Sequence, residues 1–383
     1  MKKKMKVCVV TGTRADYGIY VPLLDELKNS KDFELGILVT GMHLSPVYGY
    51  TWSDIVEDGY PIIDKVDILL QNSSHGNMAR SLGLGILGMT STFERYKPDL
   101  VILLGDRGEM LSAAISASHL NIPVAHLHGG EVSGSIDESV RHAITKLSHL
   151  HFPSTKLSSE RIIKMGERPE FVYPVGALRI DTISNAQLPT FSEVKEKYKL
   201  AVNGDYYLMV FHPVTIDKIP TGRQVENLLE ALLEKDKDIV CILPNSDAGS
   251  EEITKVYNRY FGESRITFIT NFQQLDYLTV LMHCYAMVGN SSSGILEAAS
   301  FQKAVINIGS RQTGREKSGN VIDAEPTRKA ISTALTEIEE KGFQDQLHSI
   351  KNIYGDGKAA KRILEILYSI DLDYSLIDKR ITY

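Results

Sequence analysis

The stretch Leu100-Val101-Ile102-Leu103-Leu104-Gly105-Asp106-Arg107 is an apolar run followed by a glycine turn and two opposite charges. A short run of this kind is typical of a strand buried on both faces, as in parallel sheets. The turn sets a carboxylate and a guanidinium at the carboxyl end of the strand, where α/β sheets bind ligands. Asp106 also suits the N-cap of the next helix. The stretch therefore predicts a parallel α/β sheet and a site at one edge.

The same pattern extends over the whole chain, because short β-branched runs alternate with amphipathic helical stretches. In the first half we expect strands at Val7–Thr11, Leu35–Thr40, Leu100–Leu104, Val124–Leu127, Leu150–Pro153 and Phe171–Val175. After a polar stretch from Ser184 to Lys199, we expect strands at Tyr207–Phe211, Ile239–Leu243, Ile266–Ile269, Ala286–Val288 and Val305–Ile308. The pattern predicts two facing Rossmann-like, doubly wound parallel-sheet domains with the active site in the cleft between them.

These patterns also suggest domain limits. We expect an N-terminal domain with the acid and base groups over residues 1–178 and a ligand-binding C-terminal domain over residues 179–360. Residues 361–383 form a helix and tail, and the sequence leaves open whether they pack back on the first domain. Helices are expected at Val21–Asn29, Asn77–Tyr96, Glu109–Leu120, Ile136–Leu147, Thr155–Met165, Val225–Glu234, Glu251–Tyr260, Leu275–Met282, Ile295–Ser300 and Ala359–Ile370.

Composition narrows the class of protein. The 383 residues are 43% hydrophobic and 23% charged, which fits two globular domains. The net charge of -6 and the thin spread of basic residues argue against a nucleic-acid partner. No stretch approaches the roughly 20 apolar residues that span a bilayer, so we expect no membrane partner and a cytoplasmic protein. Cys8, Cys241 and Cys284 lie far apart and are expected to be buried small hydrophobic residues.

The first strand ends in Thr11-Gly12-Thr13-Arg14-Ala15-Asp16-Tyr17-Gly18. This turn lacks the GxGxxG spacing of a dinucleotide loop, so NAD is not indicated. Arg14 is well placed for a phosphate or base, although a tight turn with solvated Arg14 and Asp16 fits equally well.

A further loop, His126–Glu131, is followed closely by Asp137, Glu138, Arg141 and His142. A His-x-His pair with acids could hold a metal, but it is a weak zinc pattern without a softer ligand. Carboxylates and imidazoles gathered at one edge also suit proton transfer, because like charges push their pKa values apart. We favour proton transfer and expect neither a metal nor a redox cofactor.

In the second half, Gly289-Asn290-Ser291-Ser292-Ser293-Gly294 follows a strand and opens a helix. Such a turn offers backbone N–H groups, hydroxyls and a helix dipole to a diphosphate. Glu297, expected in the first helical turn, suits ribose hydroxyls. Arg311 and Arg315 suit bidentate phosphate contacts, and solvated loop arginines are the alternative. His212 ends another strand and is as often a structural partner as a ligand contact.

Together these motifs resemble the hydrolysing UDP-N-acetylglucosamine 2-epimerases of sialic acid and surface polysaccharide biosynthesis, including the epimerase half of the bifunctional animal enzyme. The resemblance covers nearly the whole chain and rests on several motifs in their shared order. These are Gly12–Tyr17, Gly105–Arg107, Gly129–Gly134, Arg141–Leu147, His212–Thr215, Asp247–Ser250, Gly289–Ser292 and Tyr354–Gly357. It implies the GT-B architecture, UDP held mainly by the C-terminal domain, and no cofactor. Relatives of this kind are commonly homodimers or homotetramers.

The resemblance also implies roles for individual residues. Ser291, Ser292 and Arg315 would hold the diphosphate, Glu297 the ribose and Phe272 the uracil, with Arg14 reaching the nucleotide from the other domain. Asp106, Asp137 and Glu138 would lie on the catalytic side, with His212 near the diphosphate and sugar. His128 stands where the animal enzyme carries Glu, so the general base is open. We further expect Glu131, His128 and His212 among the catalytic residues, and His43, Arg107, Asn245 and Ser293 among the UDP-sugar contacts.

The family reaction eliminates UDP from the sugar to give 2-acetamidoglucal and then adds water, so that UDP-N-acetylglucosamine yields N-acetylmannosamine and UDP. It requires two differently placed acid and base groups. The first alternative is the same reaction on a UDP-2,4-diacetamido-trideoxyhexose of the legionaminic acid route. A GT-B glycosyltransferase and a catalytically silent UDP-sugar sensor are more remote, and the acid–base cluster argues against the sensor.

Overall fold

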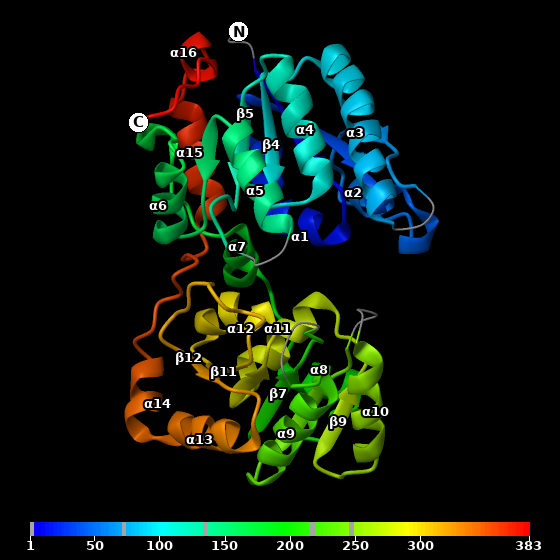
Figure 1. Cartoon of the computed structure of the whole chain (residues 1–383), viewed down its shortest axis with the longest axis vertical. Coiled ribbons are helices and arrows are strands. Elements are labelled where there is room, and N and C mark those ends of the chain that lie inside the picture. The colour runs from blue at the N-terminus through cyan, green and yellow to red at the C-terminus, as the bar shows by residue number, and fades with distance from the viewer. Residues whose placement is uncertain (1–3, 71–73, 133–135, 215–218, 245–248) are drawn as a thin grey trace. The chain divides into compact units, whose positions relative to one another are not determined.

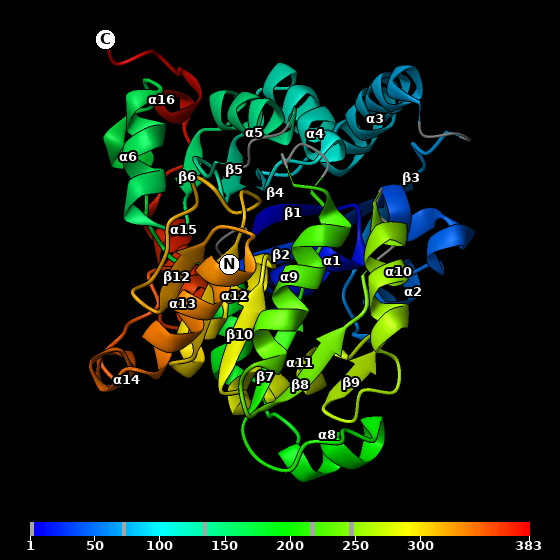
Figure 2. The same cartoon turned by 60° about the horizontal axis from the view of Figure 1, so that its bottom comes forward.

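The computed structural model of the chain describes residues 4–70, 74–132, 136–214, 219–244 and 249–383. Its contacts divide the protein into two compact units, coloured along the chain in Figures 1 and 2. Unit 1 is Met1–Thr182 together with Tyr354–Tyr383, and unit 2 is Ile183–Ile353. The first unit is therefore built from both ends of the chain.

Unit 1 contains a six-stranded parallel sheet in the order β3-β2-β1-β4-β5-β6. Successive residues of β1 point to opposite faces of this sheet. Val7 and Val9 pack with residues of α1 (Arg14–Asn29) and α15 (Ala359–Ser369), whereas Cys8 and Val10 pack with residues of α3 (His75–Tyr96) and α4 (Gly108–His119). Helices thus bury both faces. The strands are β1 (Met5–Thr11), β2 (Phe33–Thr40), β3 (Ile62–Val66), β4 (Leu100–Leu104), β5 (Val124–Leu127) and β6 (Leu150–Phe152).

The helices of unit 1 lie between and after these strands. They are α1 (Arg14–Asn29), α2 (Trp52–Glu57), α3 (His75–Tyr96), α4 (Gly108–His119), α5 (Ile136–Leu147), α6 (Lys156–Lys164), α15 (Ala359–Ser369) and α16 (Tyr374–Ile377). Helix α7 (Leu178–Asn185) spans the change from unit 1 to unit 2. Short 3-10 turns η1 (Gly41–Leu44), η2 (Pro46–Tyr48) and η3 (Pro169–Phe171) complete the unit.

Unit 2 repeats the plan with the order β12-β11-β10-β7-β8-β9. Its strands are β7 (Tyr206–Val210), β8 (Asp238–Ile242), β9 (Ile266–Ile269), β10 (Ala286–Gly289), β11 (Ala304–Ile308) and β12 (Val321–Ala324). Its helical segments are α8 (Phe191–Tyr198), α9 (Thr221–Leu233), α10 (Ser250–Tyr260), α11 (Gln274–His283), α12 (Ser292–Leu296), η4 (Ala298–Phe301), α13 (Arg328–Glu339) and α14 (Lys341–Leu347). Counted within each unit, both sheets have the Rossmann strand order, with the reversal between β1 and β4 and between β7 and β10. The predicted class of two Rossmann-like parallel sheets is confirmed.

Several local predictions differ from the structure. Phe171–Val175 is not a strand, because η3 (Pro169–Phe171) precedes a single bridge between His151 and Val172. Helix α1 begins well before the predicted Val21, since Thr13 and Asp16 form a capping box at Arg14. A second capping box, Thr190 with Glu193, opens α8 inside the polar stretch from Ser184 to Lys199, where no helix was predicted. The edge strands β3 and β12 were also missed.

The C-terminal segment joins unit 1 through specific contacts. The Asp181 carboxylate accepts the N–H groups of Ala359 (2.9 Å) and Ala360 (2.7 Å), which open α15, and the Ala177 N–H donates to the Tyr354 carbonyl at 2.6 Å. Residues 354–360, assigned from the sequence to the second domain, therefore belong to the first.

The three cysteines are buried, as the sequence predicted. Among the described residues, the helices are all too short or too polar to cross a lipid bilayer.

One glycine fixes the loop after β10. Gly289 has a φ of 142°, and a Cβ there would lie 2.0 Å from the Val210 carbonyl oxygen of β7. We predict that Gly289→Ala lowers the free energy of unfolding by about 2 kcal/mol or more, through strain and overpacking. Gly342→Ala in α14 is the control, because nothing lies within 4 Å of its added methyl. Urea unfolding that shows equal effects for both variants would contradict the assignment.

Candidate active site

Three loops meet at the carboxyl edge of the unit 1 sheet. Residues 12–16 follow β1, residues 105–107 follow β4, and residues 128–131 follow β5. Because these strands are parallel neighbours, the loops come together at the reversal of strand order. The topology therefore gathers most of the residues that the sequence assigned to catalysis.

The loop after β1 is closed around Asp16. Its carboxylate accepts hydrogen bonds from the Thr11 hydroxyl (2.6 Å), the Gly12 N–H (3.1 Å) and the Thr13 N–H (3.0 Å). Asp16 is thus buried rather than solvated. The Arg14 side chain on the same turn is 80% exposed, 3.7 Å from Asp54, and so remains available to a ligand.

His43 supports this loop. Its Nε2 lies 3.1 Å from the Thr11 hydroxyl and its Nδ1 2.7 Å from the Thr51 hydroxyl, and the side chain is fully buried. Burial lowers the pKa of His43 to about 4. These contacts make His43 a support for the turn that carries Arg14, and its expected contact with the UDP-sugar stays a prediction.

Arg141 of α5 is buried, 5% exposed, and its Nη2 donates to Asp106 after β4. Its Nε and Nη1 are buried with no hydrogen-bond partner among the described residues. An unmet buried donor costs about 1–3 kcal/mol. The arrangement therefore favours a ligand oxygen as the missing partner.

Asp106 is not the N-cap of α4, the role that the sequence offered as an alternative to a ligand contact. The N-cap position belongs to Arg107, which makes no side-chain cap bond and instead pairs with the buried Glu109 through Nε. The Asp106 carboxylate pairs with Arg141, and the Arg107 side chain is 39% exposed at the carboxyl edge of the sheet.

His126 is structural. Its Nε2 lies 2.7 Å from the Gly105 carbonyl and its Nδ1 3.1 Å from the Thr145 hydroxyl. Burial lowers its pKa to about 3. The neutral ring therefore donates to Gly105 through Nε2 and accepts from Thr145 at Nδ1.

His128 is the candidate base of this edge. It has a left-handed φ of 59°, and its Nδ1 lies 3.5 Å from Glu131, whose carboxylate accepts from the Ser154 hydroxyl at 2.7 Å. Burial lowers the pKa of His128, although Glu131 opposes that effect. The neutral ring with its proton on Nδ1 presents an Nε2 lone pair, and this buried atom has no partner among the described residues.

The first turns of α5 carry a second imidazole–carboxylate pair. His142 Nε2 lies 3.7 Å from the Glu138 carboxylate, one helical turn earlier, and His142 Nδ1 is buried without a partner in the described part of the chain. Asp137 lies beside Glu138 on an exposed position. His128–Glu131 and His142–Glu138 are therefore two histidine–carboxylate pairs of unit 1 that lie in the motifs assigned to proton transfer.

In unit 2, Asn290 organises the carboxyl edge. Its side chain accepts the His212 N–H at 2.7 Å and donates to the His212 carbonyl at 2.8 Å. The Asn290 carbonyl accepts from Arg311 (3.1 Å) and Gln312 (2.8 Å). The side chain and the backbone carbonyl of this one buried asparagine therefore connect the loops after β7, β10 and β11.

The serine loop is half-buried beside this amide. Ser291 caps α12, and the Ser293 hydroxyl donates to Glu297 at 2.6 Å while lying 2.5 Å from the Tyr277 hydroxyl. Glu297 is the C-cap of α12 rather than a first-turn residue, because the helix ends at Leu296. The Ser292 hydroxyl has no hydrogen bond within the described residues and remains open to a ligand.

The other predicted nucleotide contacts are spread around this edge. Phe272 is 6% exposed and packs edge-on against Tyr198, with ring centroids 4.6 Å apart. Arg315 is half-buried, and its guanidinium has no ion pair with the described residues. Asn245 lies outside the described residues.

Two residues with central positions were not singled out from the sequence. Arg141 and Asn290 both lie within motifs that were noticed, but their importance depends on burial and on partners from other loops. A polar residue directly after a buried strand was the available signal for Asn290.

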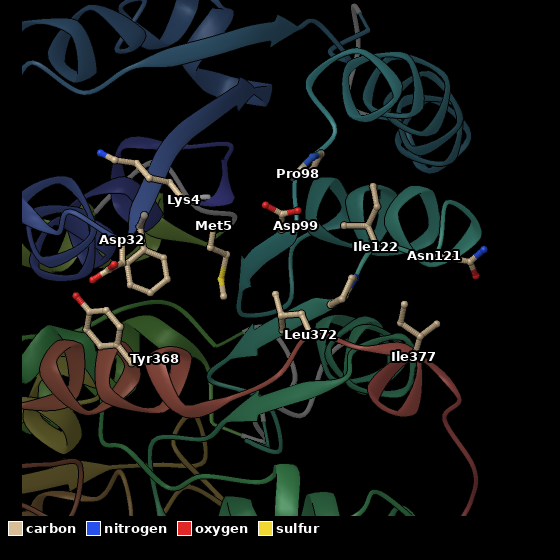
Figure 3. A pocket seen from close by; sticks show the side chains of 12 residues that line it. Lys4, Met5, Asp32, Pro98, Asp99, Asn121, Ile122, Tyr368, Leu372 and Ile377 are labelled. Carbon is tan, nitrogen blue, oxygen red and sulfur yellow. The ribbon is translucent and has the colours of Figure 1, made fainter. Parts of the chain in front are cut away.

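A cavity of about 510 Å³ lies elsewhere on unit 1 (Figure 3). Its lining includes Met5, the first residue of β1, Asp99, which directly precedes β4, and Leu372 and Ile377 from the C-terminal segment. None of the predicted site residues lines it, because it lies at the amino ends of β1 and β4.

Comparison with known proteins places these features in a class and a family. The fold is similar to that of a UDP-GlcNAc 2-epimerase from Neisseria meningitidis, solved with UDP-GlcNAc, with a TM-score of 0.77 and 20% identity over 96% of this chain and 100% of that chain. The protein is therefore of the GT-B class. The family described as UDP-N-acetylglucosamine 2-epimerase matches residues 25–368, and the chain belongs to it.

Two relatives with recorded activities are similar over most of the chain. A hydrolysing UDP-N,N'-diacetylbacillosamine 2-epimerase of Legionella pneumophila is 43% identical over 98% of this chain and 98% of its own length. A UDP-N-acetylglucosamine 2-epimerase of Neisseria meningitidis serogroup B is 34% identical over 87% of each. The protein is thus an enzyme of the UDP-sugar 2-epimerase family.

The neutral His126 predicts an acid-dependent loss of stability. As pH falls below its ordinary pKa of 6.5, the unfolded chain takes up a proton that the native ring refuses until about pH 3. This group alone should lower the free energy of unfolding by up to about 1.4 kcal/mol per pH unit. His126→Gln keeps one donor and one acceptor and should remove that slope in urea unfolding at successive pH values. The exposed His119→Gln is the control, and equal slopes for all three proteins would refute the protonation state.

Proposed function

We propose that the protein hydrolyses a UDP-2-acetamido sugar with inversion at C2, releasing UDP and the free 2-epimer. The observation that carries this proposal is the set of buried, unpartnered polar atoms on Arg141, His128 and His142. Within the described residues, all three lie in unit 1, near the Asp106 carboxylate or on the same helix. Buried polar atoms of this kind favour a polar ligand, and the two imidazoles can exchange a proton with it.

The chemistry requires what this edge offers. A base removes the C2 proton as the C1–O bond to UDP breaks, giving 2-acetamidoglucal, and water then adds at C1 while C2 is protonated from the opposite face. Two separate acid–base groups are needed. The His128–Glu131 and His142–Glu138 pairs fit this need, with Asp106 and Asp137 as further catalytic carboxylates. We assign the C2 base to His128, because its free lone pair is fixed by Glu131.

Unit 2 supplies the nucleotide contacts in this proposal. Ser291, Ser292, Arg315 and His212 hold the diphosphate and stabilise its growing charge as it leaves. Glu297 binds the ribose, Phe272 lies against uracil, and Arg14 adds a contact from unit 1.

The two candidate sugars differ only in the groups at C4 and C6. The family resemblance points to UDP-N-acetylglucosamine, but no motif of the sequence distinguishes the two sugars at C4 and C6. The 43% identity to the diacetylbacillosamine enzyme, against 34% to a UDP-N-acetylglucosamine enzyme, supports the 2,4-diacetamido-trideoxy sugar as the preferred one. A silent sensor would leave the two histidine pairs without a role, whereas a glycosyltransferase would need the acid–base groups to activate an acceptor.

Incubation with each UDP-sugar alone, followed by NMR of the products, tests the proposal. We expect UDP and the free 2-epimer from both sugars, with the higher kcat/KM for the diacetamido sugar. A higher kcat/KM for UDP-N-acetylglucosamine would reverse the preference. Release of no free sugar from either compound would contradict the function.

The division of labour between the units predicts opposite kinetic effects. Arg315→Ala should weaken UDP binding by about 1.5–3 kcal/mol, the scale of a charge-assisted hydrogen bond. Asp106→Asn should leave UDP affinity near normal and lower kcat by roughly 100-fold or more. Calorimetry with UDP and steady-state kinetics measure the two quantities. Equal losses of both quantities in both variants would indicate damage to folding instead.

A further inference from the structure

The last residues of the chain are docked on unit 1 by charged and apolar contacts. The Arg168 guanidinium donates to the Ser375 carbonyl at 3.0 Å. A methyl group on Gly166 would lie 2.6 Å from Ile381 and 2.8 Å from Tyr383. Figure 3 shows Leu372 and Ile377 of the preceding segment lining the cavity at the amino edge of the sheet. The tail thus follows one fixed path.

Lys379 of this tail caps the far end of α5. Its ammonium donates to the carbonyls of Thr145 (3.2 Å), Lys146 (2.6 Å) and Ser148 (2.6 Å). Thr145 and Lys146 belong to the last turn of α5 and Ser148 directly follows it, so the positive charge lies where it complements the helix dipole. The same helix carries Asp137, Glu138, Arg141 and His142 at its other end.

A buried carboxylate holds the ammonium in place. Glu167 is 1% exposed and lies 2.6 Å from Lys379 Nζ, 2.5 Å from Lys146 Nζ and 3.1 Å from His151 Nε2. The His151 contact and the two ammonium groups outweigh burial and lower the pKa of Glu167 to about 2. Burial lowers the pKa of Lys379 to about 8, so both partners are charged at neutral pH, and losing one partner leaves the other charge poorly compensated.

A second route leads from the cap to the site. Thr145, whose carbonyl accepts from Lys379, lies with its hydroxyl 3.1 Å from His126, and His126 reaches the Gly105 carbonyl at 2.7 Å. Gly105 directly precedes Asp106. The cap thus supports both sides of the Arg141–Asp106 pair, through α5 on one side and through His126 on the other.

We propose that Lys379 is a positioning residue, which holds α5 from its carboxyl end so that Arg141 and the acid–base groups keep their register with Asp106. The inference rests on the proposed function for its kinetic readout. The C-terminal tail is then a working part of the enzyme, although Lys379 touches no reacting atom.

The test compares Lys379→Met with Lys379→Arg and with Arg380→Met. Arg380 is the matched control, because its side chain is 82% exposed and pairs only with Asp378 in the described structure. We expect Lys379→Met to lower kcat by roughly 10- to 100-fold through misplacement of the site, with UDP affinity unchanged. Lys379→Arg should restore kcat toward the wild-type value, and Arg380→Met should leave it unchanged.

Hydrogen exchange of α5 amides gives a readout that does not depend on turnover. Loss of the cap should speed exchange in α5 by roughly 10-fold or more. The double variant Lys379→Met with Glu167→Gln removes both charges and serves if the single variant does not fold. Unchanged α5 exchange, or equal losses of kcat and UDP affinity, would overturn the inference. If wild-type protein turns over neither sugar, the proposed function fails while the exchange experiment still decides the role of the tail.

Discussion

The ion pair between Arg141 and Asp106 joins the two parts of unit 1 that carry its polar groups. Asp106 follows the central strand β4, and Arg141 lies one turn inside α5, so the pair fixes the helix against the sheet edge. The Arg141 guanidinium is 5% exposed, and two of its nitrogen atoms have no hydrogen-bond partner among the described residues, which is a cost that the rest of the fold offsets. In the proposed function, a ligand oxygen supplies the missing partner.

In unit 2, a neutral side chain connects the loops at the carboxyl edge of the sheet. Asn290 follows β10 at the matching position of its sheet; its side-chain amide binds the loop after β7, and its backbone carbonyl accepts from the loop after β11. A neutral amide avoids the desolvation cost of a buried charge. The contrast fits a division in which unit 1 handles protons and unit 2 holds an anion.

The fold followed from the sequence because apolar runs and helical periodicity are local signals. Edge strands such as β3 and β12 escaped, since they are short and half-buried. The start of α1 was missed because the Thr13–Asp16 capping box sets it, and the hydrophobic periodicity does not mark it. The loops of the site could also be located from strand ends. The roles of His43, Arg141 and Lys379 could not, because each depends on partners that only burial and long-range contacts reveal.

The central claim is that this edge moves the proton at C2 of the sugar. Turnover in D2O, with the product examined by proton NMR and mass spectrometry, tests it most directly. A base that exchanges with solvent and a second group on the opposite face must leave deuterium at C2 of the released sugar. Quantitative retention of protium at C2 would contradict the elimination route, even if the product were the expected 2-epimer.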